Sequence, residues 1–157
     1  MADQATTVTV LGVGNPIMAD DGIGLALLAA VEAARSDDRI EYVDGGTGGM
    51  ELIPVVQGAA HLLVLDAVAG KTPGTVVQLA GDQLPRMLSA KLSPHQVGLL
   101  DVFTAVRLLG NEPGEVAVVG ITPELVDLRL GLSPVIQDAL EDATAKACAV
   151  IDGWLAQ

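Results

Sequence analysis

The chain has 157 residues, of which 50% are hydrophobic and only 2% aromatic, and its formal net charge is −12 at pH 7. That charge argues against a nucleic-acid partner, because nucleic acids are bound mainly by Lys and Arg that neutralise phosphates. The length suits one domain over residues 1–157, and the apolar runs are too short to cross a membrane. With no secretion signal at its start, we expect a cytoplasmic protein.

Patterns of apolar residues predict an α/β fold. Runs rich in β-branched and apolar residues predict five strands, at residues 7–11, 40–43, 62–65, 75–79 and 116–121. Helical spacing between them predicts helices at about 21–35, 48–58, 96–109 and 134–155. This alternation predicts three α/β/α layers around a mostly parallel sheet. The connection at residues 70–74 is too short for a helical crossover, so we expect the fourth strand to be antiparallel.

The loop after the first strand carries two adjacent carboxylates, Asp20 and Asp21. The preceding Gly12-Val13-Gly14 also occurs in dinucleotide-binding loops, but that motif needs a third glycine where this chain has Ile17. The paired aspartates would also repel a pyrophosphate at the start of a helix. We therefore favour a metal or general acid–base site over nucleotide binding. The structural alternative makes Asp20 a helix N-cap and Asp21 a first-turn residue that complements the helix dipole.

Two further carboxylates end strands. Asp44 follows the second strand and Asp66 the third, and parallel strands place such ends at one edge of the sheet. A carboxylate after a strand as apolar as the third is costly to bury without a partner. Thr47 is suited to cap the next helix, which Pro54 should shorten or kink. His61 begins the third strand, so it cannot share a site with Asp66, and we interpret it as a surface or strand-start histidine.

Residues 93–96 predict the start of a helix. Ser93 is suited to be the N-cap, Pro94 the first helical residue, and Gln96 the third position of a capping box. His95 would then lie in the first turn, where the helix dipole favours the neutral imidazole. A metal site or a proton-transfer site needs that neutral form. The alternative is a histidine with a structural role only.

The candidate site combines Asp21, Asp66 and His95, with Asp20 and Asp44 close by. Two oxygen donors and one nitrogen donor, with open positions, suit a divalent transition ion such as Zn, Ni, Mn or Fe, and spacing alone does not choose among them. A Ser-His-Asp triad is disfavoured because no serine lies on a G-x-S-x-G elbow.

Three stretches together resemble the nickel-iron hydrogenase maturation proteases: residues 11–24, 44–52 and 93–99. The likeness extends to the strand end at Asp66 and to residues 120–124 and 131–134. It implies a twisted five-stranded sheet between helices. It also implies an endopeptidase, a carboxylate-dependent hydrolase, that removes a short C-terminal extension from the hydrogenase large-subunit precursor after nickel insertion.

The resemblance places the family's metal-binding positions on Asp21, Asp66 and His95. Members often carry glutamate where this chain has Asp21. Nickel would arrive on cysteines of the precursor, so that docking depends on a loaded substrate, and Asp20 or a ligand carboxylate would move protons. One alternative is a nickel-checking chaperone without peptidase activity. A second, a nucleotide-binding oxidoreductase, is disfavoured by Ile17 and the paired aspartates.

Overall fold

The fold is built on a five-stranded sheet whose strand order is β2-β1-β3-β5-β4. The computed structural model describes residues 6–80 and 94–157, without the side chains of residues 94–98 and 100. Neighbouring strands pair in parallel except β4, which runs antiparallel to β5. All five predicted strands and the antiparallel fourth are confirmed: β1 (Val8–Val13), β2 (Ile40–Gly46), β3 (His61–Ala67), β4 (Val76–Ala80) and β5 (Glu115–Ile121).

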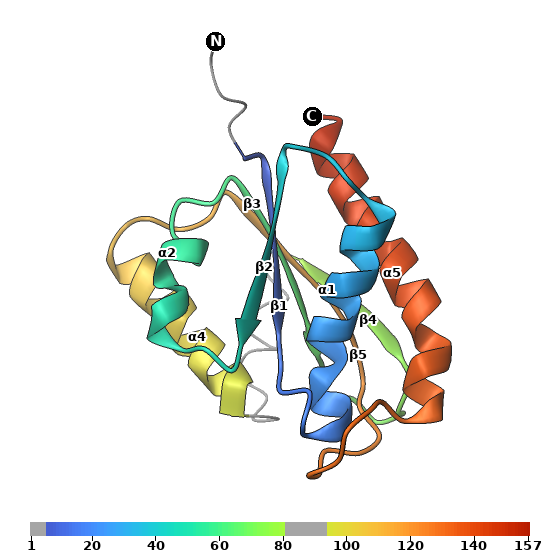
Figure 1. The fold of residues 1–157 in the computed structure, drawn as a ribbon. Coiled ribbons are helices and arrows are strands. Elements are labelled where there is room, and N and C mark those ends of the chain that lie inside the picture. Colours follow the sequence, from blue (N-terminus) through green and yellow to red (C-terminus); the bar gives the residue numbers. More distant parts are fainter. Residues whose placement is uncertain (1–5, 81–93) are drawn as a thin grey trace.

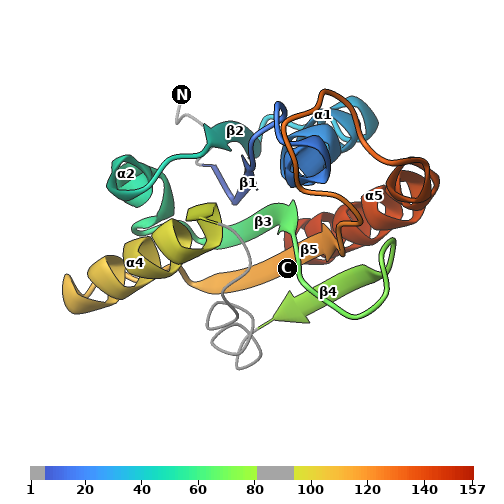
Figure 2. The same cartoon turned by 90° about the horizontal axis from the view of Figure 1, so that it is seen from below.

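Helices cover both faces of this sheet, which confirms the three-layer arrangement (Figures 1 and 2). One face carries α1 (Ile23–Ala34) and α5 (Pro134–Leu155), and the other carries α2 (Ile53–Val56) and α4 (Pro94–Leu108). A short 3-10 turn, η1 (Ala19–Gly22), precedes α1. No helix among the described residues is long and apolar enough to cross a membrane.

The predicted helix at 48–58 is wrong in length and in its cap. A 3-10 turn, η2 (Met50–Leu52), is followed by the four-residue α2, with Pro54 in the first turn of that helix. Pro54 does shorten the helix, because proline fits only the first turn. Thr47 is not the cap, since Gly49 directly precedes η2.

Alternation along β3 determines which layer each side chain meets. Leu63 and Leu65 pack in the core cluster shared with α1 and α5, whereas Leu62 and Val64 pack in the cluster shared with α2 and α4. Side chains two residues apart point to the same face of a strand. Asp66 therefore lies on the face covered by α2 and α4.

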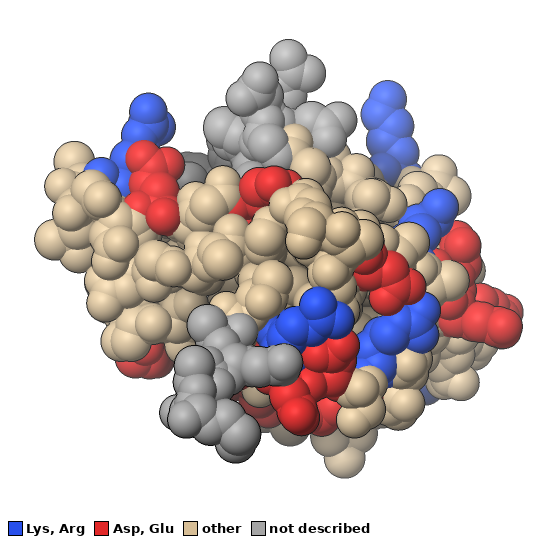
Figure 3. All heavy atoms as spheres, turned by 90° about the horizontal axis from the view of Figure 1, so that it is seen from above, with Lys and Arg blue, Asp and Glu red and all other residues tan. Residues whose placement is uncertain are grey.

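The two edges of the sheet differ in what surrounds them. At the carboxyl edge, where β1, β2, β3 and β5 end, lie η1, the start of α4 and the segment of residues 122–133 (Figure 1). At the opposite amino edge, seen in Figure 3, most basic side chains stand beside acidic ones. Loops at the carboxyl ends of parallel strands form the binding crevices of such sheets. The carboxyl edge is therefore the place to look for a site.

Candidate active site

Three carboxylates are buried at the carboxyl edge. Asp20 and Asp66 are 0% exposed and Asp21 is 5% exposed, and these are the only buried charged side chains in the described part of the chain. Burying a carboxylate costs free energy unless hydrogen bonds or a cation compensate for the lost water. The carboxyl edge therefore differs from the rest of the described structure, in which the charged side chains are not buried.

Gly14 allows the loop after β1 to fold tightly onto Asp21. Its φ is +149°, and a Cβ atom at this position would collide with the carbonyl oxygen of Asp21. The next residue, Asn15, donates its N–H to that carbonyl oxygen and to Oδ2 of the Asp21 carboxylate, both at 3.2 Å. The main chain thus holds Asp21 in place and orients its side chain.

Gly24 brings this loop against the sheet. A Cβ atom there would collide with the carbonyl oxygens of Val13 and Leu65, so the first turn of α1 presses directly on the ends of β1 and β3. Such close packing of helix on strand is one function of the third glycine in dinucleotide-binding loops. Gly24 lies in the first turn of the helix predicted at about 21–35, but no role was predicted for this glycine from the sequence.

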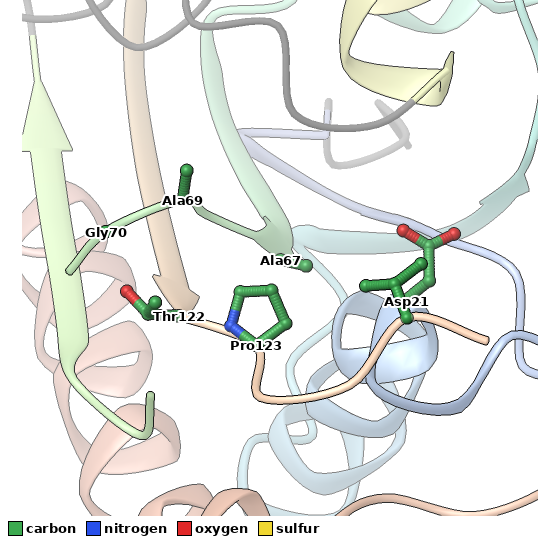
Figure 4. A pocket seen from close by; sticks show the side chains of 7 residues that line it. Asp21, Ala67, Ala69, Gly70, Thr122 and Pro123 are labelled. Atoms are coloured by element: carbon green, nitrogen blue, oxygen red, sulfur yellow. The ribbon is translucent and has the colours of Figure 1, made fainter. Parts of the chain in front are cut away.

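Asp66 lies near the end of β3, directly before Ala67. Its Oδ1 accepts the N–H of Ala67 at 2.7 Å. Ala67 and Asp21 line one pocket of about 130 Å³, together with Ala69, Gly70, Thr122, Pro123 and Val126. Figure 4 shows Asp21 and Thr122 on either side of Pro123. The structure thus brings the end of β3 and the loop after β1 to one hollow.

Asp20 has a different environment from that expected of a helix cap. Gly22, not Asp20, precedes α1, so the N-cap alternative is wrong. Oδ2 of Asp20 accepts the N–H groups of Glu124 and Leu125, both at 2.9 Å, and the Ser133 hydroxyl at 2.8 Å. Oδ1 accepts the Ser133 N–H at 2.7 Å. Asp20 therefore ties η1 to residues 122–133 and to the start of α5.

These hydrogen bonds determine the charge of Asp20. Burial raises the pKa of its carboxyl, but the bonds from Ser133, Leu125 and Glu124 outweigh burial and hold the pKa below its usual value. Hydrogen bonds donated to a carboxylate favour the charged form. Asp20 is therefore a firmly ionised group whose oxygens are already engaged.

The remaining predicted residues fall in three groups. The main chain of His95 lies in the first turn of α4, which begins at Pro94 as predicted, but its side chain and Ser93 lie outside the described residues. Asp44 is exposed, accepts the Gly46 N–H at 2.9 Å and does not line the pocket. His61 starts β3 at the amino edge, as predicted, where its ring lies 5.1 Å from that of Trp154.

The metal set of Asp21, Asp66 and His95 stays a prediction. Among the side chains that the structure describes, no group of three or more His, Cys, Asp or Glu could hold a metal ion. Asp21 and Asp66 would supply two oxygen donors at the edge of the sheet where α4 begins, and His95 would supply a nitrogen donor there (Figure 1). The donor types fit a divalent transition ion.

Sequence comparisons identify the family. A family profile described as hydrogenase maturation protease matches residues 25–150. The hydrogenase 2 maturation protease of Escherichia coli (strain K12) is 37% identical over 147 residues, which cover 92% of this chain and 90% of that protein. The hydrogenase expression/formation protein HupD of Rhodobacter capsulatus is 36% identical over 151 residues, 94% of this chain and 72% of that protein.

Solved structures agree with these relatives. The hydrogenase maturating endopeptidase HybD from E. coli has a TM-score of 0.87 and 37% identity, over 93% of this chain and 92% of that one. The [NiFe] hydrogenase maturation protease HybD from Thermococcus kodakarensis has a TM-score of 0.76 and 25% identity, over 91% and 97%. The class that fold and relatives define is an α/β endopeptidase, a hydrolase. This chain belongs to the hydrogenase maturation proteases.

Proposed function

We propose that this endopeptidase removes the C-terminal extension of the [NiFe] hydrogenase large-subunit precursor once nickel has been inserted. Membership of the hydrogenase maturation proteases supports a hydrogenase precursor as substrate, and one structural relative is named for [NiFe] hydrogenase. The observation that carries the proposal is the burial of Asp21 and Asp66, from two separate segments, at one edge of the sheet. The proposal keeps the cytoplasmic location expected from the sequence.

Nickel enters this proposal as part of the substrate. Carboxylate oxygen and imidazole nitrogen are both donors for nickel, so Asp21, Asp66 and His95 would fill open positions on an ion already held by the precursor. A cation offsets the cost of burying two carboxylates, whereas a nickel-free precursor brings no such charge. The protein would therefore bind the nickel-loaded precursor more tightly than the nickel-free precursor.

Peptide hydrolysis also needs a group that takes a proton from water and returns one to the leaving amine. Asp20 is poorly suited, because its oxygens accept four hydrogen bonds and its pKa is lowered. We assign proton transfer to Asp21 or Asp66 and a positioning role to Asp20. Nickel on the substrate would supply positive charge that polarises the scissile carbonyl.

The test uses purified protein with nickel-loaded and nickel-free precursor, and follows the intact mass of the precursor. We expect only the loaded precursor to lose a C-terminal peptide. The variants Asp21→Ala, Asp66→Ala and His95→Ala should fail to cleave it. Asp44→Ala is the matched control, because Asp44 is an exposed carboxylate at the same edge, and it should cleave normally.

Two results would contradict the proposal. A loaded precursor that binds but stays intact would favour a nickel-checking chaperone, an alternative that the family and its endopeptidase relatives do not favour. Cleavage that ignores nickel and survives loss of His95 would point to an ordinary peptidase with a different site.

A further inference from the structure

Four exposed apolar side chains lie on two segments that border the candidate site. Ile17 is 49% exposed, Val126 46%, Leu128 74% and Leu130 77%. We call these four residues the apolar strip. Single exposed apolar residues are ordinary, but several together commonly mark a contact surface.

Backbone contacts show that the two parts of the strip are neighbours. The Arg129 N–H donates to the Ile17 carbonyl at 3.0 Å, and the Ala19 N–H donates to the Arg129 carbonyl at 2.8 Å. Met18 and Arg129 form a parallel β-bridge. Residues 128–130 therefore run directly beside residues 17–19, and Figure 2 shows the segment after β5 passing along the start of α1.

The strip is also firmly anchored. The Asp20 carboxylate accepts hydrogen bonds from Glu124, Leu125 and Ser133, which lie before and after the exposed residues. The Asp20 N–H in turn donates to the Leu125 carbonyl at 3.0 Å. A buried, ionised side chain is thus used to hold a segment that presents leucines to solvent. Such a rigid apolar surface loses little conformational entropy when a partner covers it.

The strip continues into hollows at both ends. Val126 also lines the 130 Å³ pocket that contains Asp21. At the other end, Ile17 and Leu130 adjoin a second cavity of about 330 Å³, lined by Pro16, Ala19, Gly22, Leu25, Ala26, Gly131 and Leu132. A protein whose chain enters the Asp21 pocket would therefore lie against the strip.

We propose that the apolar strip docks the folded body of the hydrogenase large-subunit precursor while its C-terminal segment reaches Asp21. This inference rests on the proposed function, because it takes the precursor as substrate. Continuity with the Asp21 pocket favours the substrate as occupant, and a second copy seated there would obstruct that pocket. Asp127 and Arg129 add one charge of each sign, so the contact is apolar with a mixed polar rim.

The test compares two double variants. Leu128→Ser with Leu130→Ser removes the most exposed part of the strip, and Leu108→Ser with Leu109→Ser is the matched control. The control leucines are 83% and 64% exposed at the far end of α4.

With nickel-loaded precursor, we expect the strip variant to raise KM by about tenfold or more, from the lost burial of two leucines. Its kcat at saturation should stay within about twofold, because no reacting group is changed. Leu128→Met with Leu130→Met should restore the KM.

The outcomes separate the inference from the function on which it rests. Normal nickel-dependent cleavage with an unchanged KM in the strip variant would overturn docking and leave the function intact. A wild-type protein that sediments as a dimer, and a strip variant that is monomeric with an unchanged KM, would identify a second copy as the occupant. If the wild type cleaves nothing, the proposed function fails, and sedimentation of the loaded precursor with each variant still tests docking. Docking is overturned if wild type and strip variant bind equally or not at all.

Discussion

The charged groups at the two edges of the sheet differ in their exposure and in their partners. At the amino edge, Arg35 pairs with Asp152 and Asp37 with Arg39, each at 2.9 Å and partly open to solvent. At the carboxyl edge, the carboxylates of Asp20, Asp21 and Asp66 are buried. Exposed pairs cost little and contribute little, whereas a buried carboxylate is expensive.

This comparison distinguishes ion pairs that lie at the protein surface from buried carboxylates, which we propose serve the reaction. Within the carboxyl edge a second distinction appears, between Asp20, which is engaged by four hydrogen bonds, and Asp21, which lines the pocket. Asp66 precedes Ala67, which lines the same pocket. We propose that Asp20 maintains the shape of the site, while Asp21 and Asp66 take part in its chemistry.

The largest effect is expected from Asp66→Asn. We expect the cleavage rate of the loaded precursor to fall by roughly 10³-fold, because the amide can neither hold a cation as strongly nor take a proton. The fold should survive, since the amide oxygen can still accept the Ala67 N–H. Cleavage rate and thermal unfolding measured together check this. An Asp66→Asn protein with wild-type activity would remove Asp66 from the site.

Asp20→Asn should instead act mainly on stability. The amide NH₂ would face groups that donate hydrogen bonds, from Ser133 and from Glu124 or Leu125, so we expect a loss of about 2–4 kcal/mol in the free energy of unfolding. Ser133→Ala removes only the hydroxyl bond and should cost about 1 kcal/mol. Urea unfolding gives both values. Equal losses in the two variants would mean that Asp20 does not organise the segment.

The pH dependence of the free energy of unfolding tests the structural role of Asp20 further. Because the folded-state pKa of Asp20 lies below its usual value of 3.8, its contribution to stability is complete above that value. The contribution is lost as pH falls through the lower, folded-state pKa. We expect the stability difference between wild type and Asp20→Asn to be constant from pH 7 to pH 5, by the same linkage, and to shrink below about pH 4. Urea unfolding across this range measures it, and a difference that does not change with pH would contradict the assignment.

The smallest effect is expected at the amino edge. Arg35→Ala removes the exposed pair with Asp152, and surface pairs of this kind contribute little. We expect no measurable change in the cleavage rate or in the nickel dependence. A clear loss of activity would contradict the conclusion that the ion pairs of the amino edge take no part in cleavage.

Most of the fold could be predicted from the sequence, because strands that are buried on both faces leave an unmistakable run of apolar residues. The antiparallel β4 followed from the short connection at residues 70–74. Local signals failed around residues 47–57. There, a glycine-rich turn and Pro54 compete with helical spacing, and the helix is reduced to the four residues of α2.

The position of the candidate site could be predicted from the sequence, but the hydrogen bonds that hold Asp20 could not. Asp21 and Asp66 could be placed at one edge because parallel strands end together. The partners of Asp20 lie 104 to 113 residues away in sequence, and no local pattern connects them. Asp20 was therefore interpreted as an N-cap or a proton carrier, while the contacts assign it to the segment at residues 122–133.

The most direct test of the central claim is the affinity for nickel-loaded relative to nickel-free precursor, measured with wild type, Asp21→Ala, Asp66→Ala and His95→Ala. If these residues recognise nickel on the substrate, the wild type should prefer the loaded precursor by roughly 100-fold, about 2.7 kcal/mol. Each variant should lose most of that preference, and Asp44→Ala should keep it. A preference that persists in all three variants would mean that nickel is sensed elsewhere, or only through the shape of the precursor.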